Sequence, residues 1–262
     1  MHADRHEDAN TSRHLDRHAE RPVALVTGAA RRIGAAIARR LHADGYDLLL
    51  HYHQSEAEMR ALAADLDAAR AGSIAVRSAD LADAHALAPL IDAAIERYGR
   101  LDALINNASL FSPTPLDALS PEAVDAHYNV NARAPLLLSQ AAAPHLRRSG
   151  GDIVNIADIY AERPLRQHIA YCMSKAALVA ATRALALELA PEVRVNAVAP
   201  GAILWPDSGK SEEAKAAMLA RTPLARIGDV NEIAEAVRWL LRDACYTTGQ
   251  VLRVDGGRML DG

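Results

Sequence analysis

Cysteine, aromatic residues and long apolar runs are scarce in this 262-residue chain. It has two cysteines in no metal-ligand pattern, which argues against a disulfide framework and indicates a reducing compartment. The net charge of −4 and the lack of a long basic run argue against nucleic acid as the main partner. No apolar stretch is long enough to span a bilayer, and the N-terminus lacks the apolar core of a signal peptide. We therefore expect a cytoplasmic protein that needs no membrane.

The first 21 residues differ from the rest of the chain. They are rich in His, Arg, Asp and Glu and nearly free of large apolar side chains. Burial cannot offset the entropy of ordering such a segment, so we expect residues 1–21 to be a disordered tail. His14 and His18 would share one face of a helix, so metal binding by this pair is the alternative; we expect no metal site.

From Pro22 onward, short apolar runs alternate with amphipathic stretches. The runs predict strands buried on both faces, at residues 23–27, 47–51, 73–77, 101–106, 152–157, 194–198 and 250–254. Helical periodicity occurs at residues 33–43, 56–69, 84–98, 121–146, 168–189 and 231–241. This alternation predicts an α/β fold, with a parallel sheet in one domain over residues 22–262. Ser55 and Ser120 stand where helix N-caps are expected.

Residues 201–226 interrupt the alternation. Pro206, Gly209 and Pro223 flank a helical pattern near residues 212–221. A long insertion after the C-terminal end of a strand often covers a substrate, so we predict a lid; a passive surface loop is the alternative. Trp205 either lines the substrate site or packs within this insertion.

A glycine-containing loop follows the first predicted strand. Gly28 permits a tight turn, and Gly34 permits close approach of the next helix to the strand. The N-terminus of that helix presents free N–H groups and partial positive charge to a pyrophosphate. The loop therefore predicts a dinucleotide site.

The neighbouring residues favour NADPH over NADH. The second strand ends in His51-Tyr52-His53-Gln54-Ser55, without the acid that usually binds the ribose hydroxyls of NAD. Arg31 and Arg32 stand in the adjacent loop, and an arginine ~4 Å from a phosphate charge contributes roughly 4 kcal/mol at an effective dielectric near 20. The alternative is that both arginines face solvent.

Tyr171 and Lys175 lie four residues apart on one face of a predicted helix. A phenol titrates near pH 10, and a nearby ammonium lowers that pKa. Such a pair can deliver a proton to a substrate that receives a hydride.

These motifs occur in a fixed order, as Thr27-Gly28 with Gly34, Asn106-Asn107-Ala108, Tyr171 with Lys175, and Pro200-Gly201. In that order the chain from about Pro22 onward resembles the short-chain dehydrogenase/reductase family. The resemblance implies a Rossmann-type domain, a doubly wound seven-stranded parallel sheet and a homotetramer. It implies a proton relay supported by Asn131 and a ribose contact from Lys175. It implies further cofactor contacts from Ile33, Asp80, Leu81, Asn107, Ala108, Pro200 and Gly201.

Two departures from the common family pattern narrow the resemblance. Arg32 replaces a usual glycine, and Asp158 replaces the usual catalytic serine thirteen positions before Tyr171. With His51-Tyr52-His53-x-Ser55 and Asn107-Ala108-Ser109-x-Phe111, these departures resemble the pteridine reductases.

That subfamily implies specific roles. Arg32 and Ser109 would each contact both cofactor and substrate, and Phe111 would stack a pterin against the nicotinamide. Asp158 would pair with Tyr171 to protonate the substrate. Alternatively, Phe111 fills the core and Asp158 is a helix cap or a solvated acid.

The leading hypothesis is NADPH-dependent reduction of a dihydropterin or oxidised pterin, with dihydrofolate as a secondary substrate. The first alternative is a carbonyl reductase for 3-oxoacyl thioesters or small ketones, against which Asp158 counts. The second is a non-catalytic NADP(H)-sensing scaffold, against which the retained Tyr171 and Lys175 count. Gln54 stands where several pteridine reductases have an arginine, and we expect Ser55, His53 and Arg31 to compensate.

Overall fold

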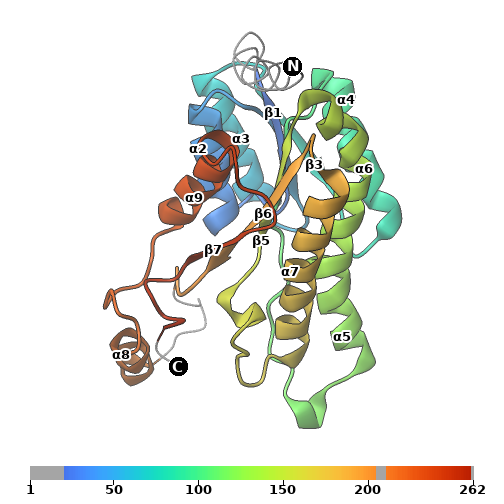
Figure 1. The fold of residues 1–262 in the computed structure, drawn as a ribbon. Coiled ribbons are helices and arrows are strands. Elements are labelled where there is room, and N and C mark those ends of the chain that lie inside the picture. Colours follow the sequence, from blue (N-terminus) through green and yellow to red (C-terminus); the bar gives the residue numbers. More distant parts are fainter. Residues whose placement is uncertain (1–20, 205–210, 261–262) are drawn as a thin grey trace, which may run out of the picture.

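Seven parallel strands form one sheet in the order β3-β2-β1-β4-β5-β6-β7. The computed structural model describes residues 21–204 and 211–260, and Figure 1 shows the sheet between two layers of helices. The strands are β1 (Val23–Val26), β2 (Asp47–Tyr52), β3 (Ile74–Ser78), β4 (Ala103–Asn106), β5 (Asp152–Ile156), β6 (Arg194–Pro200) and β7 (Val251–Val254). The order reverses between β1 and β4, which is where doubly wound sheets bind ligands. The predicted fold class is confirmed.

Helices cover both faces of the sheet. In the described part of the chain the α-helices are α2 (Arg32–Ala43), α3 (Glu56–Ala69), α4 (Leu87–Tyr98), α5 (Pro121–Tyr128), α6 (Ala134–Ser149), α7 (Ile169–Leu189), α8 (Glu212–Ala220) and α9 (Val230–Arg242). Residues of α2, α3 and α9 share one hydrophobic cluster, and residues of α4, α6 and α7 share another. The sheet therefore lies between two separate cores, as the continuous apolar strands require.

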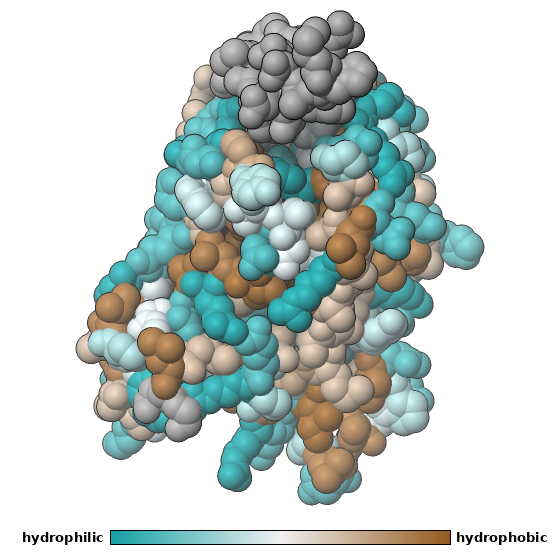
Figure 2. All heavy atoms as spheres, in the orientation of Figure 1, coloured by the Kyte–Doolittle hydropathy of each residue, from teal (hydrophilic) through white to brown (hydrophobic). Residues whose placement is uncertain are grey.

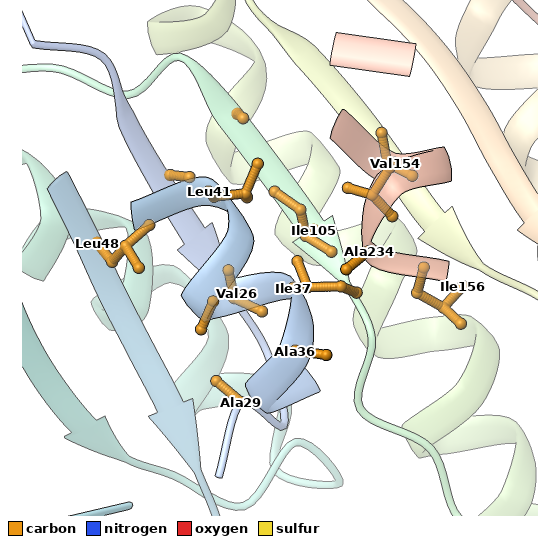
Figure 3. Packing of buried hydrophobic residues seen from close by; sticks show 14 of the residues in the cluster. Val26, Ala29, Ala36, Ile37, Leu41, Leu48, Ile105, Val154, Ile156 and Ala234 are labelled. Atoms are coloured by element: carbon orange, nitrogen blue, oxygen red, sulfur yellow. The ribbon is translucent and has the colours of Figure 1, made fainter. Parts of the chain in front are cut away.

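The pleat of β1 sends alternate side chains into these two cores. Ala24 and Val26 belong to the first cluster, and Val23 and Leu25 belong to the second. Figure 3 shows Val26 packed near Ile37 of α2. Full burial of a Leu or Val side chain contributes roughly 1.5–3 kcal/mol, so a polar substitution on either face of β1 would open a core. This strand is thereby held rigidly where it delivers the loop that follows it.

The single helix expected over residues 121–146 is wrong in detail. α5 ends at Tyr128, a π-helical turn occupies Asn129–Arg133, and α6 then continues to Ser149. The π-turn inserts an extra residue without changing the apolar pattern enough to be read from periodicity, and such turns often occur at functional sites. Ser120 caps α5 by accepting from the Ala123 amide at 3.2 Å. Ser55 occupies the N-cap position of α3, as predicted, but its side chain makes no capping hydrogen bond.

α7 also corrects the expectation that no stretch could span a bilayer. By length and composition its 21 residues would suffice, but half of the apolar window is buried inside the protein. The helix packs against the sheet and carries Tyr171 and Lys175, both buried. The core helix of a soluble protein passes the same test of length and composition, so this finding is weak evidence for a membrane span.

Two sequence predictions fall partly or wholly outside the described residues. The tail with His14 and His18 lies outside them, as does Trp205. In the insertion, α8 begins after Ser211, whose hydroxyl accepts from the Ala214 amide at 3.2 Å, as the helical pattern predicted. A lid function for this insertion stays a prediction.

Candidate active site

The loop between β1 and α2 depends on its two glycines. Gly28 has a φ of +60°, and a Cβ there would lie 2.8 Å from the Ala108 Cα. A Cβ on Gly34 would lie 2.2 Å from the Gly28 carbonyl oxygen and 2.6 Å from the Asn107 amide nitrogen. Backbone cannot yield at such distances, so both positions require glycine. The close approach predicted for Gly34 is confirmed.

The first turn of α2 is open to an anion. Its N-cap residue, Arg31, makes no side-chain cap, and the first turn holds no acid. By contrast, α9 begins with a complete capping box between Asp229 and Glu232. Arg32 opens α2 with a φ of +52°, a left-handed conformation that costs a non-glycine residue roughly 1–2 kcal/mol. Free amides beside two arginines fit a pyrophosphate, so the residues present suit a dinucleotide.

Arg31 and Arg32 stand at this edge as predicted, with both side chains exposed. The Arg31 guanidinium lies 3.7 Å from the Glu58 carboxylate, and both side chains are about half exposed or more. An exposed ion pair of this kind contributes little, so Arg31 is available to another anion. Ile33 packs partly buried against the core behind the loop.

His51 supports the loop from behind. The Gly28 amide donates to His51 Nδ1 at 3.2 Å, and Nε2 faces the Ala79 carbonyl at 3.1 Å. Burial lowers the pKa of His51, which favours the neutral ring that can accept at Nδ1 and donate at Nε2. His51 was predicted as a cofactor contact, and the structure places it behind the loop as a brace. The other predicted residues here range from half-buried Tyr52 and Ser55 to exposed His53.

Segments after β3 and β4 complete this edge. Asp80 is exposed and accepts from the Ala82 amide at 2.9 Å, whereas Leu81 is buried. Asn107 donates its side-chain amide to the carbonyls of Thr27 and Gly28, both at 2.9 Å. Ala108 lies against Gly28 as described above.

Thr27 has a structural role that the motif Thr27-Gly28 alone did not reveal. Its hydroxyl oxygen accepts from the amides of Asn107 at 2.9 Å and Ala108 at 3.1 Å. The same hydroxyl donates to the Ile105 carbonyl at 3.3 Å. One buried hydroxyl therefore fastens the segment after β4 to the end of β1. A threonine at the last position of a strand, before a glycine loop, was the available signal.

Tyr171 and Asp158 form a hydrogen-bonded pair. The Tyr171 hydroxyl donates to Asp158 Oδ2 at 2.7 Å. Asp158 also caps a short 3₁₀ turn by accepting from the Tyr160 amide through Oδ1 at 2.8 Å. The predicted pairing is confirmed, and the capping alternative holds at the same time, because the two carboxylate oxygens serve different partners.

Burial dominates the proton affinities of this pair. It raises the pKa of Asp158, even though hydrogen bonds from Tyr160 and Tyr171 and the charge of Lys175 oppose it. It also raises the pKa of Tyr171 well above 10, and the Asp158 charge raises it further. Both groups are therefore biased toward their protonated forms.

Lys175 is buried and donates to the Ile156 carbonyl at 2.8 Å. Burial lowers the pKa of its ammonium to about 8, against the charge of Asp158. Its Nζ lies 5.8 Å from the Tyr171 ring centroid. We expected this ammonium to lower the pKa of Tyr171; that pKa is instead raised, because burial and then the charge of Asp158 shift it upward. No described residue accepts the other two ammonium hydrogens, which fit a ligand hydroxyl.

Asn131 lies in the π-turn and is fully buried. Its Oδ1 accepts from the Leu110 amide at 2.7 Å, and its Nδ2 donates to the Leu110 carbonyl and the Ser174 hydroxyl, both at 2.9 Å. These bonds fix the segment after β4 against α7. Among the described residues they give Asn131 no direct bond to Tyr171 or Lys175, so its role in a proton relay stays a prediction.

Phe111 faces Tyr171 from the segment after β4. Its ring centroid lies 4.7 Å from that of Tyr171, with the planes at 87°. The side chain is 51% exposed, so the alternative of core filling is wrong. Ser109 is exposed two residues earlier, on the same segment. Figure 2 shows apolar surface at the lower end of this face, where α5 and the start of α7 lie.

The stretch after β6 borders the same edge of the sheet. Pro200 is buried, and the Gly201 amide donates to the Val254 carbonyl at 3.0 Å. A Cβ on Gly201 would lie 2.7 Å from the Asp255 Cα, so glycine is required where the chain passes β7. Residues 21–204 and 211–260 hold no group of three His, Cys, Asp or Glu side chains arranged for a metal ion.

Comparisons with known proteins agree with this geometry. The family model described as Enoyl-(Acyl carrier protein) reductase matches residues 28–258. The chain is 43% identical to "Granaticin polyketide synthase putative ketoacyl reductase 2" of Streptomyces violaceoruber, over 92% of this chain and 97% of that protein. It is 36% identical to Pteridine reductase 1 of Leishmania tarentolae, over 91% and 96%. It is 34% identical to a 3-oxoacyl-[acyl-carrier-protein] reductase of Staphylococcus aureus, over 89% and 96%.

These matches span nearly the whole chain, and they agree on the class of reaction while differing in substrate. A nicotinamide dinucleotide fits the loop after β1, and an acid–base pair is formed by Asp158, which follows β5 of the same sheet, and Tyr171 of α7. The chain belongs to the short-chain dehydrogenase/reductase family and is an oxidoreductase that acts on a small molecule with NAD(P).

Proposed function

We propose that this protein reduces pterins with NADPH, forming tetrahydropterin from dihydropterin or oxidised pterin. The observation that carries the proposal is the bond of 2.7 Å between Tyr171 and Asp158, with the half-exposed ring of Phe111 facing the tyrosine. A flat heterocycle offers a face to stack on Phe111 and ring nitrogens to protonate. Pteridine reductase 1 of Leishmania tarentolae, a relative by sequence, supports this choice.

The Tyr171–Asp158 pair can deliver one proton to the substrate for each hydride, with Asp158 restoring the proton that Tyr171 gives up. While Asp158 is ionised, the Tyr171 hydroxyl points its hydrogen at the carboxylate and away from a substrate. Once Asp158 is protonated, the acid can donate to the phenol oxygen, which frees the phenol hydrogen for a substrate atom. After that transfer the phenolate regains a proton from Asp158, and the carboxylate is left near the Lys175 ammonium. Because burial raises the pKa of Asp158, this acid form is accessible closer to neutral pH.

NADPH is the cofactor that the charges favour. When bound, it supplies the hydride for the ring carbon. Arg31 and Arg32 would hold its 2′-phosphate and pyrophosphate, and the end of β2 offers no carboxylate that would repel them. Lys175 has two ammonium hydrogens for the nicotinamide ribose. Gln54 lowers the positive charge of this site relative to an arginine.

A second candidate is reduction of a 3-oxoacyl thioester or small ketone. Two relatives favour it by name, the granaticin polyketide synthase protein and the 3-oxoacyl-[acyl-carrier-protein] reductase. Against it, a ketone needs only one hydroxyl donor on its oxygen, and a buried acid in place of that donor adds a charge that the reaction does not use. Dihydrofolate, whose ring is that of a pterin, is the expected secondary substrate.

The deciding experiment compares NADPH oxidation with dihydrobiopterin, dihydrofolate and acetoacetyl thioester under identical conditions. We expect the pterin to give the highest kcat/KM and Asp158→Ala to lower its turnover at least a hundredfold, with NADPH affinity nearly unchanged. Asp158→Ser is the matched variant, because it restores a hydroxyl without the acid and should favour the thioester. A wild-type preference for the thioester, or full pterin turnover by Asp158→Ala, would refute the proposal.

The homotetramer and the cytoplasmic location remain predictions. Light scattering of the purified chain would test the first, and fractionation of cells that express it would test the second.

A further inference from the structure

Exposed and anchored residues alternate along the segment of residues 108–114. The exposed positions are Ser109, Phe111 and Pro113, and the less exposed ones between them are Leu110, Ser112 and Thr114. Both backbone groups of Leu110 bond to Asn131, as described above. The Ser112 hydroxyl lies 3.2 Å from Nε2 of the buried His127. The segment is therefore fixed like a strand, although most of its partners are side chains.

Thr114 ties the end of this segment to the start of the catalytic helix. Its amide donates to the Gln167 carbonyl at 2.5 Å, and its hydroxyl accepts from the Ala170 amide at 3.1 Å. Thr114 and His168 also form an isolated parallel bridge. The backbone that carries Phe111 is thus connected to residues one, three and four positions before Tyr171.

The His168 ring packs on Phe111. The ring centroids are 4.7 Å apart and the planes differ by 17°, which is a stacked arrangement. The His168 Nδ1 donates to the Arg166 carbonyl at 2.8 Å, which fixes the imidazole orientation. Phe111 therefore has His168 against its face and Tyr171 near it at a right angle. A half-exposed phenylalanine without this backing would be free to change rotamer.

We propose that His168 is a positioning residue that fixes the ring of Phe111 beside Tyr171 and so selects flat aromatic substrates over small ketones. The proposal rests on the proposed function, in which Phe111 stacks on the substrate. A ring already fixed loses little rotamer freedom when a second ring stacks on it, so binding is stronger. An aromatic pair contributes enough that its loss should raise the KM of a stacked substrate about two- to tenfold. The KM of a ketone that does not stack on Phe111 should not change when this aromatic pair is lost.

The chain offers a direct probe, because Phe111 is its only phenylalanine. Labelling with 4-fluorophenylalanine gives one ¹⁹F resonance that reports the environment of this ring without any substrate. We expect His168→Ala to shift and narrow that resonance and His168→Tyr, which keeps a flat ring, to leave it near the wild-type position. His145→Ala on α6 is the control for loss of a half-buried histidine elsewhere, and it should change nothing. Equal melting temperatures confirm that the variants fold.

The kinetic arm uses dihydrobiopterin and acetoacetyl thioester. We expect His168→Ala to raise KM for dihydrobiopterin two- to tenfold with kcat and the KM of NADPH within twofold of wild type, and His168→Tyr to reverse the change. An unchanged resonance, or equal KM increases for both substrates, would overturn the positioning role. Failure of the proposed function is distinct, because it would appear as a preference of the unsubstituted chain for the thioester. The selectivity assigned to His168 would then fall with it, whatever the resonance of Phe111 shows.

Discussion

The buried ammonium of Lys175 makes the stability of this protein depend on pH in a specific way. Burial lowers its pKa from 10.5 to about 8 in the folded chain. Between these two values the unfolded chain holds a proton that the folded chain has lost. The free energy of unfolding must therefore rise with pH in that window, by about 1.4 kcal/mol for each pH unit. Below pH 8 both states carry the proton, so the penalty of burying the charge is present in full and does not change.

Lys175→Met removes this dependence while keeping the side chain long and apolar. The substitution also loses the bond to the Ile156 carbonyl, a cost on the order of 1 kcal/mol that does not depend on pH. We therefore expect the stability of wild type relative to Lys175→Met to be flat from about pH 6.5 to 7.5. It should then increase by about 2 kcal/mol between pH 8 and 9.5. The difference in unfolding free energy between wild type and Lys175→Met is taken at each pH. In its change with pH, the constant cost cancels, and so does the contribution of every group whose titration the substitution does not alter.

Urea denaturation at a series of pH values measures this difference directly. Lys215→Met is the control, because it removes a lysine at the surface of α8, where the ammonium pairs with Glu212 at 2.6 Å. A second series in the Asp158→Asn background removes the acid coupled to Lys175. Since the Asp158 charge raises the pKa of Lys175, the increase should then begin at lower pH. A stability difference that stays constant from pH 7 to 9.5 would show that Lys175 titrates alike in both states and would refute the reasoning.

Three further predictions follow from the site. Burial raises the pKa of Asp158, and the acid form of Asp158 frees the Tyr171 hydrogen, so pterin turnover should fall as the pH rises through that pKa. Asp158→Asn should abolish this decrease in the pH profile of kcat. A decrease that persists in Asp158→Asn would show that another group causes it. Gly34→Ala places a Cβ 2.2 Å from the Gly28 carbonyl oxygen. The affinity for NADPH, measured by fluorescence titration, should fall at least tenfold, and the free energy of unfolding should fall by roughly 1–3 kcal/mol. An affinity equal to that of wild type would contradict the packing argument. Asn131→Ala removes three hydrogen bonds in the core and should lower stability by about 3 kcal/mol and raise KM for dihydrobiopterin; a loss below about 1 kcal/mol would show that water replaces the amide.

The sequence predicted those parts of the fold that follow from local patterns. The run of apolar residues in β1 is buried because both faces of that strand meet helices, so its continuous pattern was informative. The π-turn at Asn129–Arg133 was missed, because one inserted residue keeps the helical apolar pattern on either side. The position of Ser55 at the N-cap of α3 was predicted, but its hydroxyl makes no capping bond, and its backbone (φ −87°, ψ 60°) departs from the extended conformation usual at an N-cap. Local chemistry indicates an element, whereas its exact ends depend on packing.

The features of the candidate site also differ in whether the sequence could predict them. The family resemblance predicted that Asp158 and Tyr171 meet, because Asp158 stands thirteen positions before Tyr171, where the family has its catalytic serine. Spacing could not show that His168 stacks on Phe111, because these residues are 57 positions apart and meet only through the Thr114 bridge. It also gave the wrong sign for the pKa of Tyr171. The sign depends on how much burial costs the phenolate, which no motif records.

The directions of the three pKa shifts indicate which way this site works. Burial is the largest cause in each case, raising the pKa of Asp158 and Tyr171 and lowering that of Lys175. Attraction between Asp158 and Lys175 opposes two of these shifts, and desolvation outweighs it in both groups; for Tyr171 the charge of Asp158 adds to the upward shift. Each buried charge is costly, so burial favours the protonated forms of Asp158 and Tyr171. A protonated phenol backed by a protonated acid can give a proton but cannot readily take one. The site therefore favours protonating a substrate that has received a hydride, and oxidation in the reverse direction should require a pH above the raised pKa of Asp158.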